Sequence, residues 1–239
     1  MKLYLETVSF DEFIEINQYI PLDGIYLSMD QLLKDPAAYS VEKTAGKLLE
    51  ALMPDQQLIV PVIQSDFRSM VDVCRKLHEL GSNIVCLLPV SPAGYMAMKV
   101  CSRKQIPSAA WNVLNPEQML FAARNEATWQ IADLEELEKS ISLPDFLQQV
   151  KALPDQTAQN TLILSCIRKP ADFRTGLLGG AAGMAADYGL YQELLLNQQT
   201  MKEQSEILQN WMEKELNAED LEDSEPDQDS QEDLTKNLE

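Results

Sequence analysis

Apolar runs alternate with amphipathic segments along most of this chain. Residues 84–90, Ile-Val-Cys-Leu-Leu-Pro-Val, contain no polar residue, which is typical of a strand that is buried on both faces. A turn sequence at 91–94, Ser-Pro-Ala-Gly, follows, and then a helical pattern begins. Residues 66–80 form the clearest predicted helix, because apolar side chains recur on one face and charged side chains on the other. The local unit is therefore a strand that leads into a helix.

This unit repeats about eight times. The predicted strands are residues 2–8, 24–28, 57–63, 83–90, 107–113, 127–132, 161–167 and 183–187. The predicted helices are residues 11–19, 40–53, 66–80, 93–103, 116–125, 144–152 and 170–178. Such alternation requires a parallel sheet with helices on its outside. The closed form, an α/β fold of the (β/α)8 TIM-barrel type, suits a chain of 239 residues.

A longer helical pattern, residues 190–216, follows the last predicted strand. Its apolar residues recur at helical spacing: Leu194, Met201, Leu208, Trp211, Met212 and Leu216. Those in its second half have no obvious partner inside the barrel. Either this helix folds back on its own barrel, or it forms a subunit contact. Residues 217–239 hold ten acidic residues and one lysine without any aromatic residue, which predicts a disordered tail. The expected organisation is a barrel at 1–189, a terminal helix at 190–216 and this tail.

The net charge of −19 argues against two classes of partner. An acidic surface repels nucleic acid and anionic membranes, and no basic stripe with interleaved aromatics offsets it. No apolar run approaches the roughly 18 residues of a membrane span. The N-terminus is too short and too soon acidic for a signal peptide. A cytoplasmic protein is therefore expected.

The cysteines and the single histidine offer little to a metal ion. Cys74, Cys86, Cys101 and Cys166 lack the paired spacing of a zinc site or of a disulfide framework. We therefore expect four reduced, mostly buried thiols. One histidine cannot make a histidine-rich metal site, so neither a metal nor a cofactor is expected.

Several scaffold motifs resemble one known family. They are Met-Lys-Leu-Tyr-Leu-Glu at 1–6, Ile-Pro-Leu-Asp-Gly-Ile at 20–25, Pro89-Val90 with Gly94 and Lys99 beyond, Gln-Ile-Pro at 105–107, and Pro170 followed by Leu-Leu-Gly-Gly at 177–180. Over roughly residues 1–215 the chain resembles the class I aldolases related to transaldolase, in particular the fructose-6-phosphate aldolase branch. The resemblance implies a (β/α)8 barrel of carbohydrate metabolism. It also implies a homo-oligomeric ring in which the terminal helix lies on a neighbouring subunit.

The resemblance places the reactive lysine of this family at position 87. That amine would attack a substrate ketone to form a Schiff base, the electron sink for carbon-carbon bond cleavage or formation. This chain has Leu87, bracketed by Ile84-Val85 and Pro89-Val90. Leucine has no nucleophile, so no catalytic residue is assigned. Lys169, the other lysine expected at the barrel mouth, would be a poor amine nucleophile when hydrated.

Other strand ends that carry the family's chemistry are changed as well. By the resemblance, Glu6 stands for an aspartate that handles protons, and Ser28 stands for an asparagine that contacts substrate. Pro61 replaces a glutamine that helps to hold a catalytic water. Trp111 replaces a hydroxyl residue, and Asp133 replaces a proton-donating tyrosine.

Two hypotheses about function stay open. In the first, the chain is a catalytically inactive relative that acts by assembly or by binding a small metabolite or a protein partner. In the second, it is an active aldehyde-lyase or transaldolase on sugar phosphates, or an enzyme with new chemistry. Glu136 falls where the family has a basic residue for the substrate phosphate, so a phosphate dianion would be repelled there. The candidate pocket is the same under both hypotheses: Glu6, Ser28, Leu87, Trp111, Asp133, Cys166 and Arg168. Leu87 and Trp111 are expected to fill much of it.

Overall fold

The computed structural model describes residues 1–35, 40–153, 160–196 and 198–222. The chain divides into two compact units, Met1–Leu194 and Leu195–Glu239, and each is described by itself.

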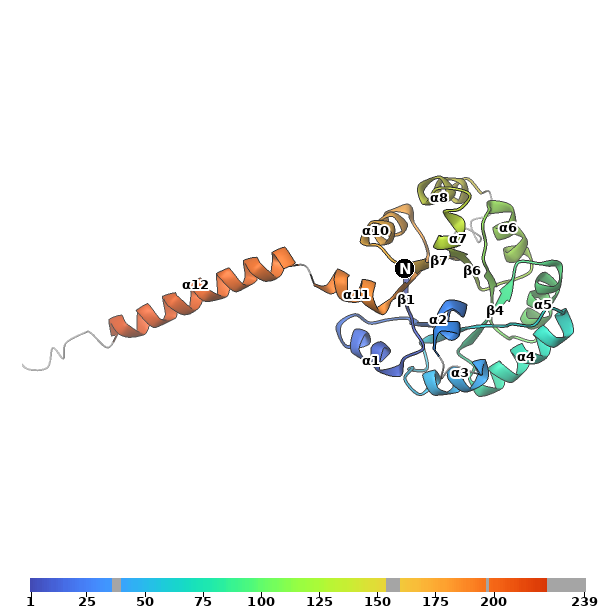
Figure 1. The fold of residues 1–239 in the computed structure, drawn as a ribbon, viewed down its shortest axis with the longest axis horizontal. Coiled ribbons are helices and arrows are strands. Elements are labelled where there is room, and N and C mark those ends of the chain that lie inside the picture. The colour runs from blue at the N-terminus through green and yellow to red at the C-terminus, as the bar shows by residue number, and fades with distance from the viewer. Residues whose placement is uncertain (36–39, 154–159, 197, 223–239) are drawn as a thin grey trace, which may run out of the picture. The chain divides into compact units, whose positions relative to one another are not determined.

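The first unit is a closed barrel of eight parallel strands in sequence order, with β1 next to both β2 and β8. The strands are β1 (Lys2–Glu6), β2 (Gly24–Tyr26), β3 (Gln57–Pro61), β4 (Ile84–Pro89), β5 (Ser108–Trp111), β6 (Trp129–Asp133), β7 (Leu162–Ile167) and β8 (Gly183–Asp187). The outer helices are α1 (Phe10–Tyr19), α3 (Val41–Leu49), α4 (Phe67–Leu80), α5 (Pro92–Arg103), α6 (Pro116–Arg124), α8 (Leu143–Lys151), α10 (Pro170–Gly179) and α11 (Tyr188–Leu195). They ring the strands as Figure 1 shows, which confirms the predicted (β/α)8 barrel.

Local capping explains where two outer helices begin. The Asp66 carboxylate accepts a hydrogen bond from the Ser69 N–H at 3.0 Å, and Asn115 Oδ1 accepts one from the Gln118 N–H at 2.9 Å. Such side chains satisfy N–H groups that the first helical turn leaves without a partner. Pro116 follows its cap at the first helical position, where it needs no N–H.

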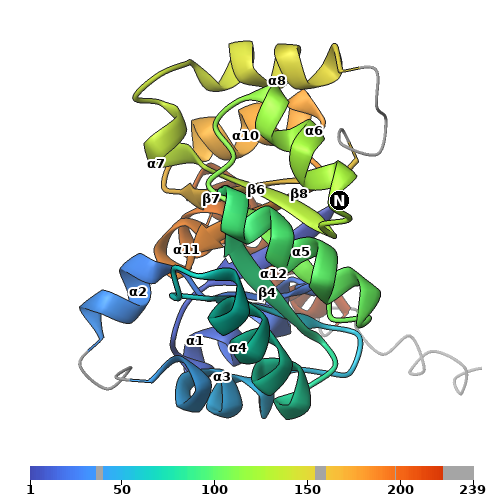
Figure 2. The ribbon, with the colours of Figure 1, turned by 90° about the vertical axis from the view of Figure 1, so that its right-hand side faces the viewer.

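Two short helices at the barrel rim were not predicted. α2 (Met29–Lys34) follows β2, and α7 (Leu134–Leu137) follows β6. Both lie on the same side of the barrel, opposite the N-terminus, as Figure 2 shows. Each is capped by a predicted pocket residue: Ser28 Oγ accepts from the Gln31 N–H, and Asp133 Oδ1 accepts from the Glu136 N–H, both at 3.2 Å. These caps hold Ser28 and Asp133 at the rim.

The inside of the barrel is a packed apolar layer. Its members come from all eight strands: Tyr4, Tyr26, Ile59, Val85, Leu87, Ala109, Ile131, Ile163 and Ala185. Leu87 is only 1% exposed, so the residue at the predicted lysine position points into the barrel. Toward the amino ends of the strands, Gln57 Oε1 accepts hydrogen bonds from the Tyr4 hydroxyl at 2.8 Å and the Trp129 indole at 3.1 Å.

The larger core lies between the strands and the outer helices. It contains Cys74, Cys86 and Cys101, from α4, β4 and α5. All four cysteines, Cys166 included, are free and buried, as predicted.

The predicted terminal helix is two helices, α11 and α12 (Gln198–Glu222). α12 extends to Glu222, six residues into the predicted tail, and residues 223–239 of that tail lie outside the described part of the chain. α12 exposes several large apolar side chains: Met201, Ile207, Leu208, Trp211 and Met212. None of the described helices combines the length and the apolar character that crossing a bilayer requires.

Candidate functional site

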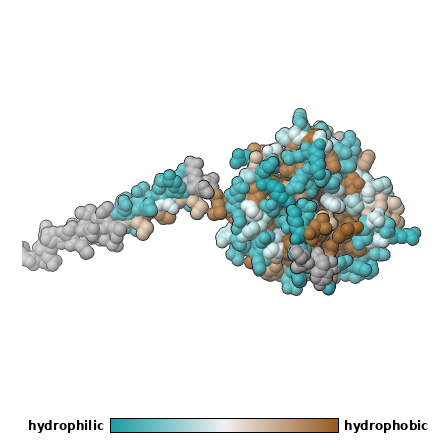
Figure 3. Space-filling model, in the orientation of Figure 1, coloured by the Kyte–Doolittle hydropathy of each residue, from teal (hydrophilic) through white to brown (hydrophobic). Residues whose placement is uncertain are grey.

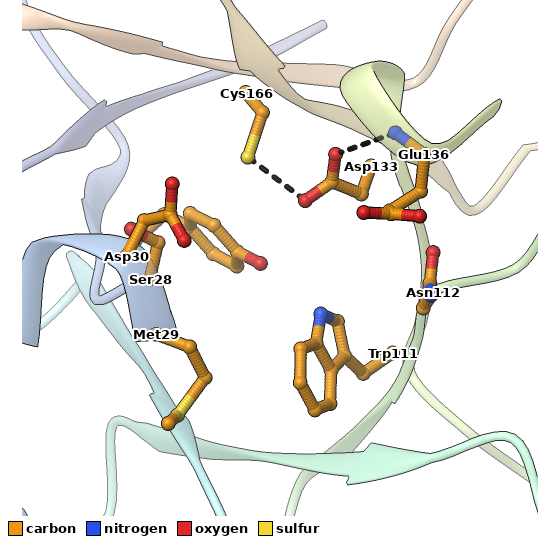
Figure 4. Close-up of a pocket in the computed structure, with 9 residues that line it drawn as sticks. Ser28, Met29, Asp30, Trp111, Asn112, Asp133, Glu136 and Cys166 are labelled. Atoms are coloured by element: carbon orange, nitrogen blue, oxygen red, sulfur yellow. Dashed lines mark hydrogen bonds between the residues drawn. The ribbon is translucent and has the colours of Figure 1, made fainter. Parts of the chain in front are cut away.

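A cavity of about 270 Å³ lies at the carboxyl ends of the strands. Its walls come from β2 and the start of α2, the end of β5, the end of β6 with α7, and β7: Tyr26, Ser28, Met29, Asp30, Trp111, Asn112, Asp133, Glu136 and Cys166. Figure 4 shows the labelled side chains of this set around an open centre. On the face of the barrel that carries α2 and α7, Figure 3 shows mostly hydrophilic residues with an apolar area to one side.

The expectation that Leu87 and Trp111 fill the mouth is wrong. The indole of Trp111 borders the cavity, as Figure 4 shows, and leaves the centre open. Leu87 does not line the cavity, because it belongs to the apolar layer inside the barrel. The layer below is apolar and buried, whereas the mouth is polar.

A β-bulge in β7 turns Cys166 toward the cavity. The register of β7 with β8 shifts between Leu164 and Ile167, and both of these side chains belong to the outer core. Two residues, Ser165 and Cys166, therefore separate two outward positions where regular alternation would allow one. Cys166 has a φ of 57°, a left-handed conformation that few residues other than glycine adopt. The bulge thus re-aims the thiol.

Cys166 is a hydrogen-bond donor in this position. Its Sγ lies 2.9 Å from Asp133 Oδ2 and 3.9 Å from Glu6 Oε1. Burial raises the pKa of the Cys166 thiol strongly, and the Glu6 and Asp133 carboxylates raise it further. Because only the thiolate is a competent nucleophile, this thiol is unsuited to covalent catalysis at neutral pH.

Glu6 and Arg168 form a two-pronged ion pair beside Cys166. Arg168 Nη1 lies 2.7 Å from Glu6 Oε2, and Nη2 lies 2.9 Å from Glu6 Oε1. The Glu6 side chain is fully buried, whereas the Arg168 side chain is 27% exposed. Burial by itself would lower the pKa of the guanidinium, but the Glu6 carboxylate overrides this effect and raises it. This charged fork has the geometry in which arginine binds a carboxylate most strongly.

Two further carboxylates approach the same guanidinium. Arg168 Nε lies 3.5 Å from Glu135 Oε1 and 3.5 Å from Asp187 Oδ2. Three acidic side chains therefore surround Arg168, the one arginine predicted at the mouth, and its N–H donors are directed at these carboxylates.

Tyr26 is a pocket residue that sequence analysis missed. It is 1% exposed and lies in the apolar layer, yet it also lines the cavity. Burial raises the pKa of Tyr26 well above its ordinary range, and the nearby Glu6 and Asp133 carboxylates raise it further. The phenol therefore stays neutral and can serve as a hydrogen-bond donor.

The predicted pocket residues separate into three groups. Ser28, Trp111, Asp133 and Cys166 line the cavity. Glu6 and Arg168 lie behind Cys166, and Leu87 lies in the layer below. Five lining residues were not in the predicted set: Tyr26, Met29, Asp30, Asn112 and Glu136. Of these, only Glu136 carried a signal in the sequence, namely its charge opposite to the family's basic residue.

No lysine lines the cavity, and none of the lysines in the described residues is buried. Lys169 is exposed at the N-cap of α10, and Lys99 is exposed on α5. Within the described ranges, no group of three or more His, Cys, Asp or Glu side chains is arranged to hold a metal ion. The site therefore offers carboxylates, aromatic rings and hydrogen-bonding groups.

Comparisons with known proteins agree with this fold. No family model matches the chain. A probable transaldolase from Thermoplasma acidophilum is 24% identical over 216 residues, which cover 88% of this chain and 95% of that protein. A probable transaldolase from Nitrosopumilus maritimus is 31% identical over 134 residues, 54% of this chain and 56% of that protein. A crystal structure of 3-hexulose-6-phosphate synthase superposes with a TM-score of 0.56 and 14% identity, covering 80% of this chain and 92% of that one. Over most of its length this chain is thus a (β/α)8 barrel similar in sequence to probable transaldolases.

Proposed function

We propose that this chain is a transaldolase-like barrel that has lost Schiff-base chemistry and that binds a small metabolite at its mouth. The observation that carries the proposal is the buried side chain of Leu87 inside the barrel, together with the absence of any lysine from the cavity lining. A Schiff base needs a primary amine that can reach the substrate carbonyl. None of the described residues that line the cavity supplies such an amine.

The surroundings of Arg168 support the same proposal. An arginine binds a sugar phosphate only if its donors are free to reach the phosphate oxygens. Arg168 is instead engaged by buried Glu6 and approached by Glu135 and Asp187. Glu136 also lines the cavity, and its negative charge repels a phosphate dianion.

A second candidate is an enzyme with different chemistry at the same mouth, because the cavity is open and polar. Asp133 borders it and is a possible proton acceptor. Cys166 is unsuited to act as a nucleophile, and Glu6 is held by Arg168. An active aldehyde-lyase or transaldolase would need an amine from outside the cavity, for which exposed Lys169 is the candidate. Loss of turnover in Asp133→Asn or Glu6→Gln would support this alternative.

We also propose that α12 forms a contact between subunits of a homo-oligomer. Ile207, Leu208, Trp211 and Met212 are each more than half exposed on this helix. Positions 207, 208, 211 and 212 fall on one face of an α-helix, because side chains three and four residues apart are neighbours. A continuous apolar face of this kind marks a surface for another protein chain.

Borohydride trapping tests the loss of Schiff-base chemistry. The protein is incubated with dihydroxyacetone or fructose 6-phosphate and borohydride, and its intact mass is measured beside that of an active transaldolase. We expect no adduct on this chain, while the active enzyme gains one. The variant Lys169→Arg is the matched control for reaction at the exposed rim lysine. A stoichiometric adduct on wild type would overturn the proposal, and its loss in Lys169→Arg would identify the amine.

A further inference from the structure

The cavity has an excess of negative charge that its immediate surroundings do not neutralise. Asp30, Asp133 and Glu136 contribute carboxylates to the lining, and no arginine, lysine or histidine is among the lining residues. Lys34 lies 3.6 Å from Asp30, and Lys139 lies 2.6 Å from Glu136. Both lysines are largely exposed, and exposed pairs of this kind are screened and weak. The field inside the cavity is therefore negative.

The remaining lining adds aromatic rings and an unsatisfied acceptor. Tyr26 and Trp111 border the cavity, and an aromatic ring attracts a cation that lies over its face. Asn112 also lines the cavity, and its buried Oδ1 has no hydrogen-bond partner among the residues that the structure describes. A buried acceptor without a donor is unfavourable, and a ligand with an N–H or O–H group can supply one.

From this combination we infer that the mouth binds a small organic cation: an ammonium group seated among Asp30, Asp133 and Glu136, with a compact body against the Tyr26 and Trp111 rings. This inference rests on the proposed function and names the ligand class of the same site. Carboxylates only accept hydrogen bonds, so they favour a ligand rich in donors. At about 270 Å³ the cavity lies just below the range of roughly 300–1,000 Å³ that drug-sized ligands occupy. The ligand is therefore a compact metabolite.

Charge and shape can be separated with isosteric probes. Choline and ethanolamine carry the ammonium group, while 3,3-dimethylbutan-1-ol and propan-1-ol are their neutral counterparts. We measure binding to the full chain by calorimetry and by saturation-transfer NMR. At least one cation is expected to bind with a millimolar or smaller Kd, about tenfold tighter than its neutral counterpart.

Variants locate the binding. Asp133→Asn and Glu136→Gln should each weaken cation binding about tenfold while leaving the neutral alcohols unchanged. Glu138→Gln is the matched control, because Glu138 is exposed and does not line the cavity. Trp111→Phe should keep more of the affinity than Trp111→Leu, since only phenylalanine preserves an aromatic face. Circular dichroism establishes that each variant is folded.

The outcomes separate this inference from the proposed function. Equal affinity for cation and alcohol, or no binding of either cation to the folded protein, would overturn the cation assignment. Tighter binding of inorganic phosphate or fructose 6-phosphate would overturn it too, and without a borohydride adduct the loss of Schiff-base chemistry would still stand. A borohydride adduct together with the expected cation binding would overturn the loss of Schiff-base chemistry and leave the cation assignment standing.

Discussion

Glu6 and Arg168 are joined behind Cys166 by two short contacts of 2.7 and 2.9 Å, although 162 positions separate them in the chain. Glu6 ends β1 and Arg168 follows β7. The barrel brings them together because β8 alone lies between these two strands. The pair therefore engages the one arginine predicted at the mouth with a buried carboxylate of the protein itself.

Removing Arg168 should destabilise the barrel. Arg168→Ala leaves the Glu6 carboxylate buried without its partner, and we expect the free energy of unfolding at neutral pH to fall by about 3 kcal/mol. Arg168→Lys should cost less, because it keeps the charge but loses the fork. Urea unfolding measures both. Exposed Arg174→Ala is the control and should stay within about 0.5 kcal/mol of wild type. Equal stability of the two alanine variants would show that the ion pair is unimportant.

Restoring a lysine at position 87 should not restore aldol chemistry. Leu87→Lys supplies an amine, but the groups for proton transfer and phosphate binding are still missing. Burial in the apolar layer should also lower the free energy of unfolding by about 3 kcal/mol. A coupled fructose 6-phosphate cleavage assay and urea unfolding test this. Leu87→Met, a volume-conserving control, should cost less than about 1.5 kcal/mol. Robust cleavage by Leu87→Lys would mean that the other strand ends were misinterpreted.

Cys166 should react slowly with iodoacetamide at neutral pH, because its raised pKa keeps it a thiol. Asp133→Asn removes one carboxylate that raises this pKa and should accelerate the alkylation. Peptide mass spectrometry follows the modification of Cys166 alone. If Asp133→Asn reacts at the wild-type rate, access and not ionisation controls the reaction.

The free energy of unfolding should fall at alkaline pH, because the pKa of Cys166 is raised in the folded state. The folded thiol of Cys166 stays protonated, whereas an unfolded thiol ionises near pH 8.5. The unfolded state therefore loses protons first, and the free energy of unfolding falls above that pH by up to about 1.4 kcal/mol per pH unit for each such group. Cys166→Ala should show a shallower alkaline slope than wild type in urea unfolding. Identical slopes would contradict the raised pKa.

The exposed apolar face of α12 should hold subunits together. Trp211→Glu places a charge on this face, and we expect light scattering after size exclusion to report a smaller mass than for wild type. Gln209→Glu adds the same charge at an exposed polar position and should leave the mass unchanged. A monomeric wild-type protein would rule out the proposed contact.

Hydrophobic patterning along the chain was sufficient to predict the alternating strands and helices of the barrel, whereas the family resemblance singled out position 87. Each strand of a parallel barrel is buried on both faces, so its apolar run is a local signal that needs no knowledge of its neighbours. The strand ends follow from these runs, and the resemblance named Ser28, Trp111 and Asp133 at three of them. In the structure these three residues and Cys166 line one cavity.

Only the tertiary structure decided what those residues contact. The bulge that turns Cys166 inward depends on how β7 registers against β8, and the pairing of Glu6 with Arg168 depends on closure of the sheet. Tyr26 is also beyond local inference, because an apolar strand position becomes a cavity wall only where the neighbouring strands leave space. The sequence by itself determined which residues stand at the rim; the closed sheet determined that they surround an open, negatively charged cavity, because the distances between strand ends are set by the whole barrel.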